Sequence, residues 1–98
     1  MVEVLLMVDK IRCAHILVKT EAEAKLMLDQ IGKGVSFSNL AAEKSQCPSG
    51  KRGGDLGVFG RGMMVREFER AAFALEKGQM TQSPVKTEFG WHIIKRLE

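Results

Sequence analysis

The segment from Ile11 to Val18 constrains the fold more than any other, because it is mostly apolar on both faces of a strand. Successive side chains of a strand point to opposite faces. A strand with two apolar faces is expected in the middle of a sheet that is covered on both sides. His15 then points from the centre of the sheet into an enclosed space. The alternation puts Ile11, Cys13, His15 and Leu17 on one face and Ala14, Ile16 and Val18 on the other.

Two helices are expected directly after this strand. Thr20 and Glu23 have the spacing of a capping box, in which the Thr20 hydroxyl accepts a hydrogen bond from the Glu23 amide. Ser36 is positioned to cap a second helix that runs to about Lys44. Helical spacing gives the first helix an apolar stripe made of Ala24, Met27, Leu28 and Ile31. The buried face of the second helix is made of Phe37, Leu40 and Ala41.

Glycines interrupt both periodicities between residues 45 and 62, around a short apolar segment at residues 56–59, which predicts a loop, a short strand and another loop. Pro84 begins a further short strand, residues 87–90 form a turn, and residues 91–97 form the last strand. Before them, a third helix ends at Lys77 and Gly78 and has the stripe Val65, Phe68, Ala72 and Leu75.

This order of elements predicts an α+β fold, with a mostly antiparallel four-stranded sheet covered by three to four helices. A chain of 98 residues is the length of one domain and is too short for two cores that fold independently of each other. We expect one domain at residues 11–98 after an N-terminal extension at residues 1–10. The first six residues are interpreted as optional, either frayed or paired as an edge strand. No large apolar stripe remains once the core is assigned, so we expect a monomer.

Charge and cysteine content favour a cytoplasmic protein that binds neither nucleic acid nor membrane. The net charge is +3, and the basic residues are mixed with acidic ones along the chain, whereas nucleic-acid binders concentrate basic residues. Two cysteines are too few for a disulfide framework. The apolar start of the chain lacks a basic flank and is shorter than a membrane span. We therefore expect a reducing compartment and free thiols.

Several kinds of chemistry find no support in the motifs. The glycine-rich segment lacks the Gly-Lys-Ser/Thr ending of a phosphate-binding loop and the glycine spacing of a dinucleotide-binding loop. We expect no cofactor. The cysteines and histidines leave open a zinc site, which the missing Cys-x-x-Cys disfavours, a thiol nucleophile activated by imidazole, or buried structural histidines. These four residues are Cys13, His15, Cys47 and His92.

Three ordered segments resemble the parvulin-type peptidyl-prolyl cis-trans isomerases. Residues 11–19, IRCAHILVK, are similar to the opening strand of that family. Residues 53–64, GGDLGVFGRGMM, resemble its central signature and lead into FERAAF at residues 68–73. Residues 84–94, from Pro84 to Ile94, are similar to its last hairpin. The resemblance implies a parvulin-like fold and a rotamase that assists protein folding, without metal or cofactor.

The resemblance also implies a role for particular residues. His15 and His92 match paired histidines on neighbouring central strands, and Thr87 matches a polar residue linked to them. Cys47 matches a position that is Cys or Asp in the family, where it acts as a modulator rather than a covalent nucleophile. These four are the implied catalytic residues. The implied pocket for the proline ring consists of Leu56, Met64 and Phe68, each of which could also be an ordinary core residue.

The implied substrates are proline-containing segments of unfolded or flexible proteins. Lys19 is followed by the acidic stretch at residues 20–23, whereas phosphate-directed relatives have a basic loop there, so no strict phosphoserine requirement is expected. Lys19, Lys51 and Arg52 are secondary electrostatic contacts that would favour an acidic residue before proline. Phe89 is expected to add an apolar wall. The alternative function is a non-catalytic binding module or chaperone that uses the same pocket.

Overall fold

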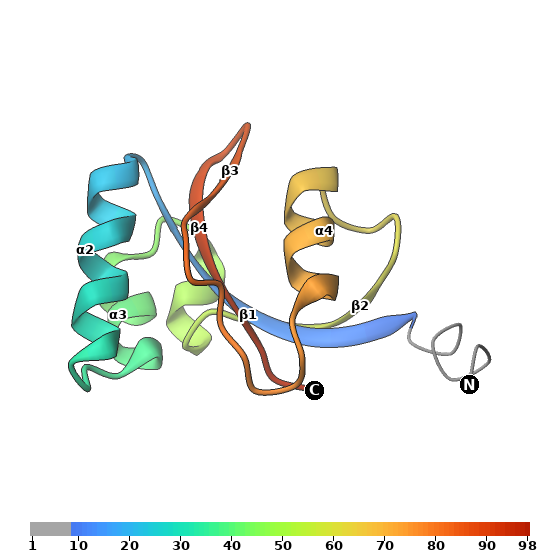
Figure 1. Ribbon diagram of the computed structural model, residues 1–98, viewed down its shortest axis with the longest axis horizontal. Coiled ribbons are helices and arrows are strands. Elements are labelled where there is room, and N and C mark those ends of the chain that lie inside the picture. Colours follow the sequence, from blue (N-terminus) through green and yellow to red (C-terminus); the bar gives the residue numbers. More distant parts are fainter. Residues whose placement is uncertain (1–8) are drawn as a thin grey trace.

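The computed structural model describes residues 9–98, which form an antiparallel sheet of four strands in the order β2-β1-β4-β3 (Figure 1). Three α-helices and one short 3-10 helix, η1, complete the fold. The predicted α+β class is confirmed. In chain order the elements are β1 (Lys10–Val18), α2 (Glu21–Gly32), α3 (Phe37–Lys44), η1 (Pro48–Arg52), β2 (Asp55–Gly60), α4 (Arg66–Ala74), β3 (Val85–Thr87) and β4 (Gly90–Arg96).

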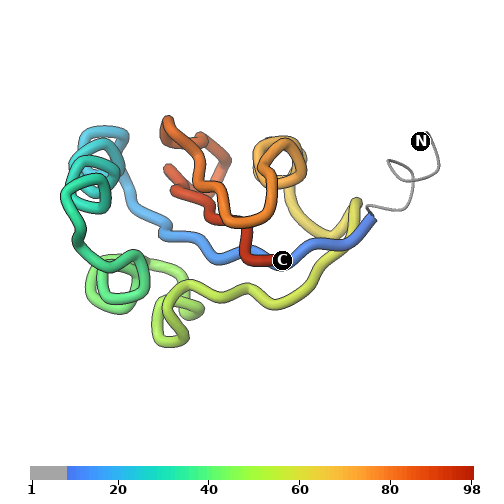
Figure 2. Tube along the Cα trace, turned by 60° about the horizontal axis from the view of Figure 1, so that its bottom comes forward, coloured from blue at the N-terminus to red at the C-terminus, as the bar shows by residue number. Residues whose placement is uncertain are grey.

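Strand β1 lies at the centre of the sheet, as its two apolar faces predicted. It pairs with β4 on one side and β2 on the other. The chain leaves β1, passes through α2, α3 and η1, and returns so that β2 lies alongside β1 (Figure 2). In the pairing of β1 with β4, His15 lies opposite Ile94 and Leu17 lies opposite His92. The two histidines are therefore diagonal neighbours on one face of the sheet.

The two faces of the sheet support two separate cores. One face carries Ala14, Ile16, Val18 and Ile93 and packs against α2 and α3. The other face carries Ile11, Cys13 and Ile94 and packs against α4 through Phe68 and Ala72. In Figure 1, α2 and α3 lie on one side of β1 and β4, and α4 lies on the other. Successive side chains of β1 therefore pack alternately into the two cores, as the alternation in the sequence predicted.

Both predicted helix caps are present. The Thr20 hydroxyl accepts a hydrogen bond from the Glu23 amide at 3.1 Å, and the Ser36 hydroxyl accepts one from the Asn39 amide at 3.2 Å. Each bond satisfies an amide that the first turn of a helix leaves without a backbone partner.

Several predicted boundaries were wrong: β1 and β2 begin one residue earlier than predicted, and β3 begins at Val85 rather than at Pro84. The first loop of the glycine-rich segment contains η1, in which the Gly50 amide donates to the Cys47 carbonyl. Helix α4 ends at Ala74, because Leu75 is extended and its carbonyl accepts a hydrogen bond from the Arg96 guanidinium at 2.7 Å instead of continuing the helix. Strand β4 begins and ends one residue earlier than predicted.

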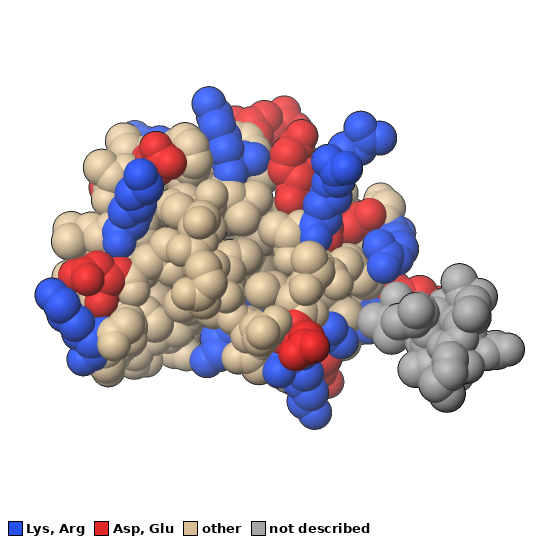
Figure 3. All heavy atoms as spheres, in the orientation of Figure 1, with Lys and Arg blue, Asp and Glu red and all other residues tan. Residues whose placement is uncertain are grey.

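Charged side chains are mixed on the surface. On the face seen in Figure 3, Lys and Arg side chains lie among Asp and Glu side chains. Within residues 9–98, no helix is both long and apolar enough to cross a membrane. The expected extension at residues 1–6, frayed or paired as an edge strand, lies outside the described residues.

Candidate active site

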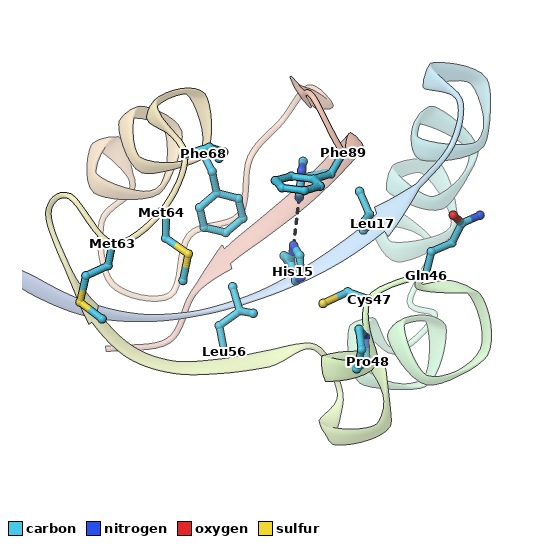
Figure 4. A pocket seen from close by; sticks show the side chains of 12 residues that line it. His15, Leu17, Gln46, Cys47, Pro48, Leu56, Met63, Met64, Phe68 and Phe89 are labelled. Carbon is cyan, nitrogen blue, oxygen red and sulfur yellow. Dashed lines mark hydrogen bonds between the residues drawn. The ribbon is translucent and has the colours of Figure 1, made fainter.

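A cavity of about 510 Å³ opens on the α4 side of the sheet, above the middle of β1 (Figure 4). Its walls come from the central strands β1 and β4, the segment that leads into η1, β2, the β2–α4 connection, the start of α4 and the β3–β4 turn. Segments far apart in sequence therefore meet around one space. The lining residues are His15, Leu17, Gln46, Cys47, Pro48, Leu56, Met63, Met64, Val65, Phe68, Phe89 and His92.

The two histidines form a hydrogen-bonded chain at the base of the cavity. The Nδ1 atoms of His15 and His92 lie 3.0 Å apart. His92 Nε2 lies 2.7 Å from the Thr87 hydroxyl, which accepts a further hydrogen bond from the Phe89 amide at 3.2 Å. The predicted contacts of both histidines with each other and with Thr87 are thus present. The chain links the two central strands to the β3–β4 turn.

The environment of the two imidazole rings favours their neutral form. Burial lowers the pKa of His15 to about 4, and the proximity of His92 adds to the effect. Burial likewise lowers the pKa of His92 to about 4. Two facing Nδ1 atoms can share only one hydrogen, so one ring donates and the other accepts. His15 Nε2 is buried and lacks a hydrogen-bond partner among the described residues, so a second proton there would leave an unsatisfied charged donor.

Phe68 belongs both to the cavity and to the core. Its side chain is 3% exposed and packs in the cluster beneath α4. Its ring also lies edge-on to both imidazoles, with centroid distances of 5.5 Å to His15 and 5.3 Å to His92. Leu56 and Met64, which are only partly buried, line the same cavity. The structure therefore brings together the three residues of the predicted proline pocket.

Cys47 lies at the edge of the cavity, directly before η1. Its sulfur accepts a hydrogen bond from the Ser49 hydroxyl at 3.2 Å. The preceding residue fixes this segment to β1, because the Gln46 amide donates to the Leu17 carbonyl at 2.8 Å. The hydrogen bonds of His15 and His92 go to each other and to Thr87, and none joins either ring to the Cys47 thiol. Neither imidazole therefore has the hydrogen bond to sulfur by which a histidine activates a thiol nucleophile.

The donor groups that could bind zinc do not gather. Among residues 9–98, no three or more His, Cys, Asp or Glu side chains come close enough to hold a metal ion. Both cysteines are free thiols. Cys13 is fully buried, and burial raises the pKa of its thiol to about 11.

The three basic residues expected as secondary contacts lie apart from the cavity wall. Lys19, Lys51 and Arg52 are all exposed, and none of them lines the cavity. Other lining residues were missed, although most are neighbours of predicted ones. Leu17 shares a strand face with His15, which the alternation could have indicated. The remaining missed residues are Gln46, Pro48, Met63 and Val65.

Comparison with known proteins gives consistent results. The PPIC-type PPIase domain, a rotamase family, matches residues 5–98. The foldase protein PrsA of Geobacillus kaustophilus is 55% identical over 87 residues, which cover 88% of this chain but only 31% of PrsA. The chain thus spans about a third of the length of such curated relatives.

Two solved structures match over nearly their whole length. The parvulin of Nitrosopumilus maritimus, NmPin, is 46% identical with a TM-score of 0.81, covering 92% of this chain and 97% of that one. Pin from the psychrophilic archaeon Cenarchaeum symbiosum is 52% identical with a TM-score of 0.80, covering 94% of this chain and 95% of that one.

Proposed function

Because this chain belongs to the PPIC-type peptidyl-prolyl cis-trans isomerases, the parvulins, we propose that its cavity binds a proline ring and catalyses rotation of the peptide bond before it. The family resemblance noted in the sequence is thereby confirmed. One observation supports the proposal above others: an apolar cavity whose base is a neutral, hydrogen-bonded histidine pair. Such a site can hold an uncharged ring and a polar peptide group side by side.

Rotation about the bond before proline breaks no covalent bond, so no nucleophile is required. The barrier of about 18–20 kcal/mol arises because the twisted peptide loses its resonance. Turnover within milliseconds requires lowering it by roughly 6–7 kcal/mol, at about 1.4 kcal/mol for each tenfold change in rate. Uncatalysed exchange takes tens of seconds or more. The site must therefore bind the twisted state more tightly than the planar one.

The apolar side chains supply the grip. Leu56, Met64 and Phe68 hold the proline ring, so that the twist is concentrated in the bond before it. They also exclude water from the carbonyl group. The planar amide has more charge separation than the twisted one, so the loss of water destabilises the planar state more.

The polar side chains position the site. His15, His92 and Thr87 form a rigid base because every link in their chain is a hydrogen bond between strands or turns. The low pKa values of both histidines keep the rings uncharged at neutral pH. The floor of the cavity therefore does not attract counter-ions. Cys47 lies next to the rotating carbonyl as a weak donor, oriented by the Ser49 hydroxyl.

The experiment that tests the proposal follows cis–trans exchange of a proline-containing tetrapeptide by NMR. We expect exchange well above the spontaneous rate, and at least about a tenfold reduction for Met64→Ala, because that change removes a large part of the grip. Leu26→Ala on α2 is the matched control, since Leu26 is 59% exposed and lies outside the cavity. A denaturation curve for each variant verifies that it is folded.

The second candidate is a non-catalytic peptide-binding module or chaperone. The exposed Met63 and Phe89 at the cavity favour peptide binding as such. If the tetrapeptide shifts the cavity resonances but exchanges only at the spontaneous rate, this candidate replaces the catalytic one.

The expected substrates are proline-containing segments of flexible or partly folded proteins, consistent with the foldase name of the PrsA relatives. A monomer in the cytoplasm is also part of the proposal. Two free cysteines, one of them buried, support a reducing compartment.

A further inference from the structure

Two large apolar side chains stand exposed beside the cavity. Met63 is 68% exposed and Phe89 is 65% exposed, yet both line it. Single exposed apolar side chains are common on protein surfaces, whereas apolar surface that is continuous with a binding groove is typical of an interaction site. The two come from different segments, the β2–α4 connection and the β3–β4 turn, and they lie apart in Figure 4. They therefore extend the cavity in two directions.

The polar and apolar ends of the site determine which neighbour of proline each exposed side chain would meet. In Figure 4, Met64, Phe68 and Met63 lie on one side of His15, and Cys47 with Leu17 lies on the other. In that view Phe89 lies above His15, with Phe68 on one side of it and Leu17 on the other. If the proline ring occupies the first side, the carbonyl that rotates lies toward Cys47. The residue before proline supplies that carbonyl, so its side chain comes to Leu17 and Phe89.

The wall at this end carries no charge. Among residues 9–98, no Lys, Arg, Asp or Glu lines the cavity, and the low pKa values of its histidines keep them neutral at pH 7. A carboxylate moved from water into such surroundings would lose hydration without gaining a partner. An apolar side chain would instead bury surface against Leu17 and the Phe89 ring.

The turn that carries Phe89 is held in place. Its amide donates to the Thr87 hydroxyl, which is bonded to His92. Gly90, at φ 140°, packs so closely that an added Cβ would lie 2.6 Å from the Val18 carbonyl. The backbone of Phe89 is therefore fixed relative to β1 and the histidines, although its ring is exposed.

We propose that Phe89, together with Leu17, is the specificity-determining residue for the position before proline and selects an apolar side chain there over an acidic one. The proposal rests on the function proposed above. It replaces the expectation that Lys19, Lys51 and Arg52 favour an acidic residue before proline. These three residues are exposed and do not line the cavity.

The test compares two tetrapeptides that differ only in the residue before proline, Leu or Glu. Both kcat/KM, from NMR exchange, and Kd, from NMR titration, are measured at physiological salt. We expect the unmodified chain to favour the Leu peptide by about tenfold, the scale for placing one apolar side chain in a pocket. Phe89→Ser should reduce that ratio to about two or less, and Phe89→Leu should retain most of it. Leu26→Ser, of similar exposure on α2, should leave the ratio unchanged.

The contrary outcomes are distinct. A ratio near one in the unmodified chain, or one that Phe89→Ser leaves intact, overturns the assignment of Phe89. A preference for Glu that disappears in Lys51→Ala or Arg52→Ala also overturns it, in favour of electrostatic selection. If neither peptide exchanges faster than spontaneously, the proposed catalysis fails, and the ratio of the two Kd values still decides the role of Phe89.

Discussion

Protonation of His15 and His92 is disfavoured in the folded chain, since burial lowers the pKa of each from 6.5 to about 4. Between those two values the unfolded chain binds protons that the folded chain does not. Stability therefore rises with pH across this window and is lost as the pH falls from about 6.5 toward 4. Each unit of pKa difference corresponds to about 1.4 kcal/mol per independent group. We expect the free energy of unfolding to be flat above about pH 7.5 and clearly lower at pH 5.

Urea denaturation at several pH values measures this effect, and the imidazole C–H resonances in the folded chain give the two pKa values directly. The carboxylates act in a different range: hydrogen bonds from the Arg12 guanidinium and the Gly57 amide hold the pKa of Asp55 below its usual 3.8. The stability from Asp55 is present above that value and lost only in more acidic solution. Equal stability at pH 7.5 and 5 would contradict a neutral, buried histidine pair.

How much of the site could be predicted differs from residue to residue. Strand alternation alone predicted that His15 shares an enclosed face of β1 with Leu17, but not that this face borders the cavity. The pairing of His15 with His92 required the register of β1 against β4, which the sequence indicated only through the family resemblance. The hydrogen bond from Ser49 to Cys47 could not be predicted, because it depends on the backbone of η1.

At the scale of elements, η1 and β2 are held against β1 by a glycine. The Gly54 carbonyl accepts from the His15 amide at 2.9 Å, and a Cβ on Gly54 would lie 2.3 Å from the His15 carbonyl oxygen. Gly54→Ala should therefore destabilise the fold by at least about 2 kcal/mol. Gly57→Ala is the matched control, since Gly57 also has a positive φ but no atom near its missing Cβ. It should cost only about 1 kcal/mol.

Guanidinium denaturation of both variants measures the difference. If Gly54→Ala costs no more than Gly57→Ala, the close approach of this backbone to β1 is not a constraint on the fold.

Elements whose side chains have a regular period, such as α2 and β1, were predictable from the sequence. The glycine-rich segment was not. A glycine-rich stretch has no side-chain period, so the position of η1 depends on its contacts with α3, β2 and β1. Similarly, the end of α4 at Ala74 is set by Arg96, which is 22 residues away in sequence.

At the scale of the whole molecule, one sheet separates the core packed against α2 and α3 from the core that forms the site. Ile93 and Ile94 are adjacent on β4 and both fully buried, but they point to opposite faces. Ile93 packs with α2 and α3, whereas Ile94 lies opposite His15 and packs in the cluster of Phe68. Removing one methyl group from each thus disturbs a similar amount of buried surface, on the face of the sheet that forms the site for Ile94 and on the opposite face for Ile93.

We therefore expect Ile93→Val and Ile94→Val to lower the free energy of unfolding by similar amounts, about 0.5–1.5 kcal/mol each. Their effects on catalysis should differ. Ile93→Val should leave peptide exchange unchanged at 25 °C, where the chain stays folded, and Ile94→Val should slow it about threefold, because a small shift of Phe68 and His15 weakens the grip on the twisted peptide. Denaturation and NMR exchange on the same samples separate the two quantities. If both variants reduce the exchange rate equally, changes in the core on the α2 and α3 side affect the site as strongly as changes in the core that forms it. That result would contradict the expected difference between the two faces of the sheet.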